Sequence, residues 1–285
     1  MQARWALGSA VALTLGALLM IWPPQAKAQA ADADLQAINA LTHLPETLDL
    51  IRQEGIQQGK DLGSDLFGDS EDPNWLSALD RVYDTGQMTG LYNAALRQVL
   101  AQDPSLSNNI RPFLDSDLGQ RVITLELEAR RTTMDKVAMQ AAREVFVELE
   151  KTDKFRRAQI ERLVVAGDLI EANVMAGLNG NLTFYKAMAA VGTPGTPNDE
   201  AELLAQVWSQ EADIRASVEE FLYPIMALAY APLNEDELQS YVDFSESPAG
   251  TRFNDALSKA FDPLMIELSR KLGTEAGKLL SGQML

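Results

Sequence analysis

Cysteine and histidine are almost absent from this chain of 285 residues, which contains no cysteine and one histidine, His43. Without cysteine, the chain cannot form disulfides, thiolate metal sites or a cysteine nucleophile. One histidine cannot supply a multi-histidine metal site, which excludes the helical di-iron bundles that need two Glu-x-x-His motifs. Aromatic residues amount to 7% of the chain, few for the aromatic-lined sugar cleft that is usual in glycosidases.

Positive charge is also scarce. The chain carries 24 lysine and arginine residues against 41 aspartate and glutamate residues, a formal net charge of −17. Such a chain repels a polyanion at long range, so no nucleic-acid partner is expected. Hydrophobic residues amount to 46% of the chain, which is ample for a packed core and argues against wholesale disorder. Because disulfides are excluded, the fold must be held together by packing alone.

Long apolar runs are limited to residues 5–22, which follow the basic Arg4 and end at a Pro-Pro pair. Small-x-small tripeptides, typical of cleavage sites, come directly after this run. The pattern predicts a secretory signal peptide over residues 1–28, with cleavage after residue 30 as the alternative. The other interpretation is an uncleaved anchor, because about 18 apolar residues can span a bilayer. We expect a periplasmic or secreted protein with no stable membrane span after cleavage.

The remainder of the chain has the periodicity of helices. Apolar residues recur at helical spacing in most segments, and no segment alternates apolar and polar residues for long. The longest uninterrupted pattern covers residues 117–150, Asp153 can cap the next helix, and Asn-Gly-Asn at 179–181 predicts a turn. We therefore predict an all-α fold.

A Gly/Pro-rich segment at residues 192–198 is the clearest linker in the sequence. It separates an N-terminal helical region, residues 31–191, from a C-terminal helical region, residues 199–285. The length of the chain is compatible with one large domain or two small ones, and both arrangements stay open.

Two short segments carry the same residue types at the same spacing, which indicates an internal duplication. The matched residues are Phe113, Ser116, Gly119 and Arg121 in the first segment and Phe244, Ser247, Gly250 and Arg252 in the second. Each serine can cap the N-terminus of a helix, and Pro248 can occupy a first helical position, where its missing N–H costs nothing. We predict a helical bundle of two related helix–corner–helix units joined by long helices, with the degenerate copy in the N-terminal region.

The other matched residues have expected roles at the two corners. The glycines lie in the first turn of each new helix, where the lack of a side chain lets another helix approach. The phenylalanines precede the caps and can pack back on the new helix as hydrophobic staples. The arginines lie where the helix dipole disfavours a cation, so we expect salt bridges to acids, with contact to an anionic ligand as the alternative.

The second segment continues a longer pattern that begins at Tyr230. Asn234 and Glu237 form a capping-box-like helix start ahead of it. Residues of about 215–275 resemble the DUF2059 family of secreted helical proteins. The matching residues are Tyr230, Glu237, Leu238, Phe244, Ser247, Pro248 and Gly250, whereas Ser245 stands where the family usually has tyrosine. The resemblance implies a helical fold and an envelope location, and it implies no activity because the function of the family is unknown.

Three further patterns could carry chemistry, and each has a simpler structural interpretation. Asp84-Thr85-Gly86 matches an aspartic-protease triplet, but the second triplet is missing, so we expect a connector between helices. Five acids crowd a Gly-rich segment at residues 61–72, which is interpreted as a solvated loop, with weak Ca²⁺ binding as the alternative because the EF-hand order is absent. His43 accompanies no Gly-x-Ser-x-Gly motif and is interpreted as a surface or capping residue.

No catalytic residue, cofactor-binding residue or metal ligand is assigned from the sequence, and no cofactor is expected. The leading hypothesis is a non-enzymatic periplasmic or envelope protein that binds or scaffolds an unknown envelope protein or ligand. One alternative is a carboxylate-dependent hydrolase. Its best candidate acids flank the corners and are Asp115, Asp117, Asp243 and Glu246. The other alternative is a carrier or chaperone with an apolar groove, which the scattered methionines favour.

Overall fold

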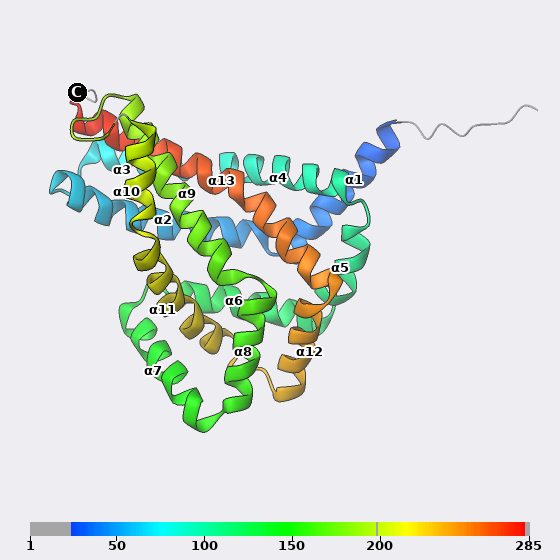
Figure 1. Cartoon of the computed structure of the whole chain (residues 1–285). Helices are drawn as coiled ribbons and strands as arrows, with labels where there is room; N and C mark the ends of the chain where they lie inside the picture. Colours follow the sequence, from blue (N-terminus) through cyan, green and yellow to red (C-terminus); the bar gives the residue numbers. More distant parts are fainter. Residues whose placement is uncertain (1–23, 198, 283–285) are drawn as a thin grey trace, which may run out of the picture.

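A computed structural model describes residues 24–197 and 199–282, and regular secondary structure in these ranges is helical throughout (Figure 1). This confirms the prediction of an all-α fold. In chain order the helices are α1 (Pro24–Leu41), α2 (Leu44–Phe67), α3 (Pro73–Val82), α4 (Thr85–Gln102), α5 (Leu106–Leu114), α6 (Asp117–Thr132), α7 (Lys136–Thr152), α8 (Lys154–Ala166), α9 (Leu169–Ala190), α10 (Glu200–Trp208), α11 (Glu211–Tyr230), α12 (Glu235–Glu246) and α13 (Pro248–Leu280).

The predicted signal peptide falls largely on undescribed residues. Its apolar run, residues 5–22, lies outside the described part of the chain, and α1 begins at Pro24, ahead of both predicted cleavage positions. Among the described helices, none combines the length and the apolar character needed to cross a membrane.

Two large hydrophobic cores form the interior. The first lies between α1–α5 and α13, in the upper part of Figure 1, and contains the fully buried Trp75. The second lies between α6, α7, α8, α11 and α12, in the lower part of the same view. Residues from both sides of the 192–198 segment build each core, because α13 completes the first and α11 and α12 complete the second. The N-terminal and C-terminal regions therefore interlock.

The Gly-rich segment that was interpreted as a loop is largely helical, so that prediction is wrong. Helix α2 continues to Phe67, and Asp61 and Asp65 lie on it. Three glycines of α2, spaced by four residues, face α3 and the residue that follows it. An added Cβ would lie 2.2 Å from Tyr83 at Gly55, 2.4 Å from Leu79 at Gly59 and 2.7 Å from Trp75 at Gly63. The indole N–H of Trp75 donates to the Gly59 carbonyl at 2.7 Å. Close packing against α3, rather than a turn, explains these glycines.

Two further predictions about helix ends are wrong. The pattern over residues 117–150 is divided into α6 and α7, because the Asp135 side chain accepts hydrogen bonds from two backbone N–H groups of α7 and caps that helix. The turn expected at residues 179–181 lies inside α9, where a Cβ on Gly180 would lie 3.2 Å from the Ser269 hydroxyl of α13. Contact with α13 stabilises α9 through residues that favour a turn in isolation.

Candidate functional site

The two predicted corners have the same local hydrogen bonds. The Ser116 hydroxyl accepts from the Gly119 N–H at 3.0 Å and caps α6, and the Ser247 hydroxyl accepts from the Gly250 N–H at 3.1 Å and caps α13. Each hydroxyl also donates to the carbonyl of the phenylalanine three residues earlier, at 2.6 Å. Pro248 lies at the start of α13. The capping predictions for both serines are confirmed.

The corner glycines lie against backbone. A Cβ on Gly119 would lie 2.1 Å from the Phe113 carbonyl oxygen, and a Cβ on Gly250 would lie 2.1 Å from the Phe244 carbonyl oxygen. The approaching backbone is the last turn of the preceding helix in the same corner. Glycine is therefore needed for the chain to turn so sharply between the two helices.

The corner phenylalanines join the two units. The rings of Phe113 and Phe244 stack with centroids 3.9 Å apart and planes at 8°. Packing back on the new helix was expected, and Phe244 does this, with its ring 6.5 Å from that of Phe253 in α13; the stacking of the two phenylalanines between the corners was not expected. In addition, α5 of the first unit packs against α13 of the second, and α6 of the first packs against α12 of the second. Each helix of one unit therefore contacts a helix of the other unit.

The corner arginines follow the same crossing pattern. Arg121 forms a salt bridge with Glu237 at 2.5 Å and donates to the Pro232 carbonyl at 2.7 Å, both near the start of α12. Arg252 lies 3.5 Å from the Asp103 carboxylate, just ahead of α5. Both arginines therefore pair with acids, as the salt-bridge interpretation expected, and the acids come from the opposite unit.

Three cavities meet at two residues of α6, Glu126 and Arg130. The inner cavity, of about 270 Å³, has walls from α2, α4, α6 and α13. The tyrosine cavity, of about 400 Å³, includes Tyr230 and Tyr241. The outer cavity, of about 470 Å³, lies between α2, α6, α9 and α11. Since all three share these residues, we treat them as one candidate site.

Glu126 is held by two tyrosines. Its Oε1 accepts from the Tyr230 hydroxyl at 2.7 Å and from the Tyr241 hydroxyl at 2.8 Å, whereas its Oε2 has no hydrogen-bond partner among the described residues. Burial raises the pKa of Glu126, and the hydrogen bonds from the tyrosines oppose this without reversing it. Burial also raises the pKa values of both tyrosines, which keeps them neutral donors. The Glu126 carboxyl group therefore presents its Oε2 atom to the cavities, free of hydrogen bonds from the described residues.

Arg130 is fixed by an acid of α2. Its Nε and Nη2 donate to the two carboxylate oxygens of Glu54 at 2.9 and 2.7 Å, a bidentate pair. The Glu54 side chain is 15% exposed and the Arg130 side chain 39% exposed. Nη1 of Arg130 has no partner within the described part of the chain, so one N–H₂ group stays available to a ligand.

Tyr92 adds a buried polar atom to the inner cavity. Its side chain is fully buried, its ring lies 4.7 Å from the ring of Phe261, and its hydroxyl has no hydrogen-bond partner in the described ranges. Burial raises the pKa of Tyr92, so the group stays protonated. A buried hydroxyl without a partner costs roughly 1–3 kcal/mol, which a ligand that accepts its hydrogen bond would recover.

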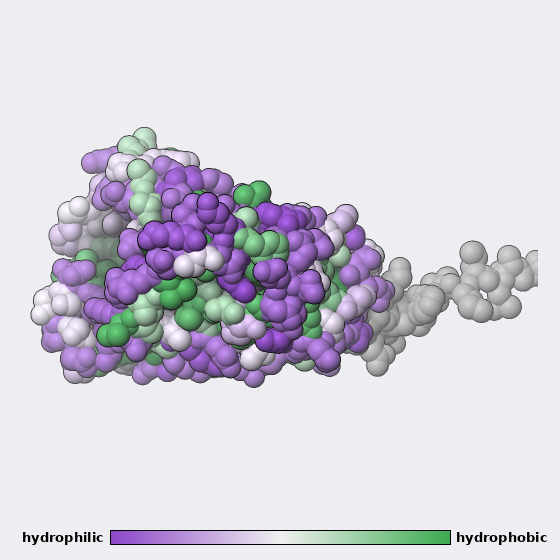
Figure 2. Space-filling view, turned by 90° about the horizontal axis from the view of Figure 1, so that it is seen from below, coloured by the Kyte–Doolittle hydropathy of each residue, from purple (hydrophilic) through white to green (hydrophobic). Residues whose placement is uncertain are grey.

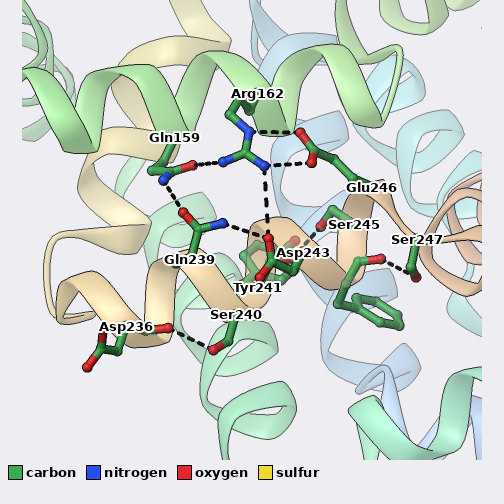
Figure 3. A network of polar contacts seen from close by, with 11 residues as sticks. Gln159, Arg162, Asp236, Gln239, Ser240, Tyr241, Asp243, Ser245, Glu246 and Ser247 are labelled. Carbon is green, nitrogen blue, oxygen red and sulfur yellow. Dashed lines mark hydrogen bonds and ion pairs between the residues drawn. The ribbon is translucent and has the colours of Figure 1, made fainter.

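A polar network on the outer side of α12 positions Tyr241 (Figure 3). Arg162 of α8 donates to both carboxylate oxygens of Glu246 at 2.8 and 2.6 Å and to Gln159 at 2.8 Å. Gln159 in turn donates to Gln239 at 2.6 Å. These contacts hold α12 against α8 and fix the backbone from which Tyr241 reaches Glu126.

The four acids considered for a hydrolase lie elsewhere. Asp115 pairs with Arg111 at 3.2 Å, and the hydrogen bond from Arg162 lowers the pKa of Glu246. Asp243 accepts a hydrogen bond at 2.6 Å from the side chain of Gln239, and Asp117 lies in the first turn of α6. The structure does not bring these acids to the cavities that surround Glu126.

The other residues singled out in the sequence lie at the starts of helices. Asp84 caps α4 by accepting from the Gln87 N–H at 2.8 Å, which confirms the connector interpretation. His43 occupies the position before α2 with φ at 49°, and its Nε2 lies 3.2 Å from the Gln120 side-chain oxygen. Asp72 caps α3. Within the described residues, no group of three or more acids or histidines is arranged to hold a metal ion.

Glu126 is the site residue that the sequence analysis missed. It lies between Val122 and Ala129 at helical spacing, and both of these residues are buried. An acid on the apolar stripe of an amphipathic helix is the signal that could have identified it.

Apolar side chains also reach the surface outside the cavities. Figure 2, seen from below the view of Figure 1, shows hydrophobic residues among hydrophilic ones on the face to which α7 and α8 contribute. The exposed residues of these two helices include Val137, Val145, Val147, Phe155 and Val165.

Comparison of the chain with protein-family models, curated proteins and solved structures gives no match. The resemblance of residues 215–275 to the DUF2059 family therefore stays a prediction.

Proposed function

We propose that this is a non-enzymatic binding protein of the cell envelope that holds a small amphipathic ligand around Glu126 and Arg130. The observation that carries the proposal is the meeting of three cavities at these two residues. Mainly apolar cavities with a few convergent polar groups are typical of small-molecule binding sites. The envelope location rests on the predicted signal peptide.

The polarity of the cavities suggests how the ligand lies. The inner cavity is walled mainly by apolar side chains, which include Leu44, Ile123, Leu127, Phe253, Leu257 and Phe261. The outer cavity has polar walls, which include Glu54, Gln57, Gln58, Asp61, Lys136 and Asn173. The apolar part of the ligand would occupy the inner cavity and its polar end the outer one.

The charged residues of the outer cavity indicate which net charge the polar end of the ligand carries. Glu54 and Asp61 contribute negative charge, and Arg130 and Lys136 contribute positive charge. Because these four charges balance, a neutral or zwitterionic head group fits better than a net anion. Tyr92 and Glu126 favour a ligand that also carries a hydrogen-bonding oxygen near its middle.

The proposal is tested with a neutral apolar probe, the fluorescent N-phenylnaphthylamine, on the full chain. We expect saturable binding to the wild-type protein and loss of binding in Leu257→Trp, which fills the inner cavity. Val165→Trp is the matched control, because Val165 is 78% exposed and lines none of the three cavities. Circular dichroism verifies that both variants fold. Absence of saturable binding, or equal binding by wild type and Leu257→Trp, would refute the proposal.

A carboxylate-dependent hydrolase is the second candidate, and one observation favours it. Glu126 and Glu54 line the same cavity, and burial raises the pKa of Glu126. A carboxyl group with a raised pKa can serve as general acid while a second carboxyl group serves as base. Screening on esters and glycans would separate the two functions: an activity that Glu126→Gln abolishes while probe binding persists would favour the hydrolase.

A further inference from the structure

A second pocket, of about 320 Å³, lies between α3, α4 and α13 and shares no residue with the cavities around Glu126. Four cations line it, in a chain with a net charge of −17. They are Arg81, Arg270, Lys271 and Lys278, and the pocket contains one acid, Glu275. The floor includes the buried apolar residues Ala78 and Val82.

The acids near this pocket do not neutralise its cations. Glu275 accepts from Arg81 at 3.0 Å and from Lys278 at 2.7 Å, so two cations share one carboxylate. Glu267 pairs with Arg270 at 2.6 Å. Four cations are thus matched by two acids. The nearby Asp84 accepts from the Gln87 N–H at the start of α4 and is already engaged as its cap.

Lys271 has no acidic hydrogen-bond partner in the described part of the chain. Its ammonium group donates to the Gln87 side-chain oxygen at 2.6 Å, which holds it in place without cancelling its charge. Lys271 is half-buried on α13. Folding has therefore already removed part of the water around its ammonium group, and a ligand that binds there has less water to displace.

The helix dipole explains two of the four cations. Cations stabilise the last turn of a helix, and the effect decays beyond it. Arg81 lies in the last turn of α3 and Lys278 in the last turn of α13. Arg270 and Lys271 lie more than two turns before the end of α13, and of these two only Arg270 has an acidic hydrogen-bond partner among the described residues, Glu267. The positive charge of Lys271 therefore needs another explanation.

We infer that this pocket binds a small oxyanion, a phosphate or carboxylate group on a low-molecular-weight ligand. Lys271 and the Nη1 group of Arg270 supply charged donors, and the Gln87 amide supplies a neutral one. Arg81, which is held by Ser77 and Glu275, adds positive charge. The apolar floor accommodates the carbon part of such a ligand. This site is independent of the proposed cavity ligand, whose polar end is neutral or zwitterionic.

The test titrates the full chain with inorganic phosphate and with succinate by isothermal calorimetry at constant ionic strength. We expect binding of at least one anion, and Lys271→Gln should weaken it about tenfold or more, the effect of one charge-assisted hydrogen bond. Lys259→Gln is the matched control, because it removes the same charge from an exposed position on α13 that lies outside the pocket.

Each outcome decides the inference. Tighter phosphate binding assigns the site to phosphate groups, and tighter succinate binding assigns it to carboxylates. Failure to bind either anion, or equal weakening by Lys271→Gln and Lys259→Gln, overturns the inference. Binding of the neutral probe in the cavities should be the same in both variants, so the two sites are tested separately.

Discussion

Replacing Gly250 by alanine should destabilise the protein, although the residue lies in a helix. Alanine has a higher helix propensity than glycine, worth about 1 kcal/mol. At this corner, however, the new Cβ would lie 2.1 Å from the Phe244 carbonyl oxygen and 2.8 Å from the Phe244 carbonyl carbon and the Ser245 Cα. These are backbone atoms, which cannot rotate away as a flexible side chain can.

The expected cost follows from these two opposing effects. Overpacking of this kind costs about 1–3 kcal/mol, and the backbone contacts place Gly250→Ala at the upper end of that range. After the gain in propensity is subtracted, we expect a net loss of about 2 kcal/mol in the free energy of unfolding. Gly119→Ala should behave in the same way, because its Cβ would meet the Phe113 carbonyl at the same 2.1 Å.

Gly90→Ala is the matched control. Gly90 is exposed in α4, and a Cβ there would have nothing within 4 Å. The same substitution should therefore stabilise the protein by about 0.5–1 kcal/mol. Urea denaturation followed by circular dichroism compares the midpoints of the three variants with wild type. If Gly250→Ala matched Gly90→Ala in stability, the corner would not need glycine and the reasoning would be refuted.

Three other predictions concern charge and processing. The folded-state pKa of Glu126 lies above its unfolded value, so stability should fall as pH rises through the folded-state pKa, and Glu126→Gln should lose this dependence in urea denaturation at a series of pH values. Arg121→Gln and Arg252→Gln should each cost less than about 1 kcal/mol in the same assay, because both salt bridges are partly exposed to solvent; a greater loss would show that the corners depend on them. N-terminal sequencing of exported protein should begin at residue 29 or 31, whereas a product that begins at Met1 and sediments with membranes would contradict the signal peptide.

Local features of this fold could be predicted from the sequence. Periodicity identified the helical class, and the caps at Ser116, Asp153 and Ser247 followed from the residues themselves. Capping is decided by hydrogen bonds within three residues of the cap, so it needs no knowledge of the rest of the molecule.

Features that depend on distant partners could not be predicted in this way. From the sequence alone, the glycines of α2 indicate a loop. They are compatible with a helix because large side chains from α3 and Tyr83 pack against them, and this packing is not visible in the sequence. The stacking of Phe113 on Phe244 joins residues more than a hundred positions apart. The raised pKa of Glu126 comes from the burial that the fold creates around its side chain, against the opposing effect of the hydrogen bonds from the two tyrosines.

The crossed packing of the two corners has a consequence for the order of folding. The first core, built largely by α1–α5, also needs α13, whose buried residues reach from Ala256 to Ala276. A growing chain therefore lacks one wall of this core until α13 has been synthesised, long after α5. Contacts this distant along the chain form slowly, since a long loop must close first. The intermediate keeps apolar surface uncovered for longer than a protein of sequential helical hairpins would, which makes assistance from a chaperone advantageous during its synthesis.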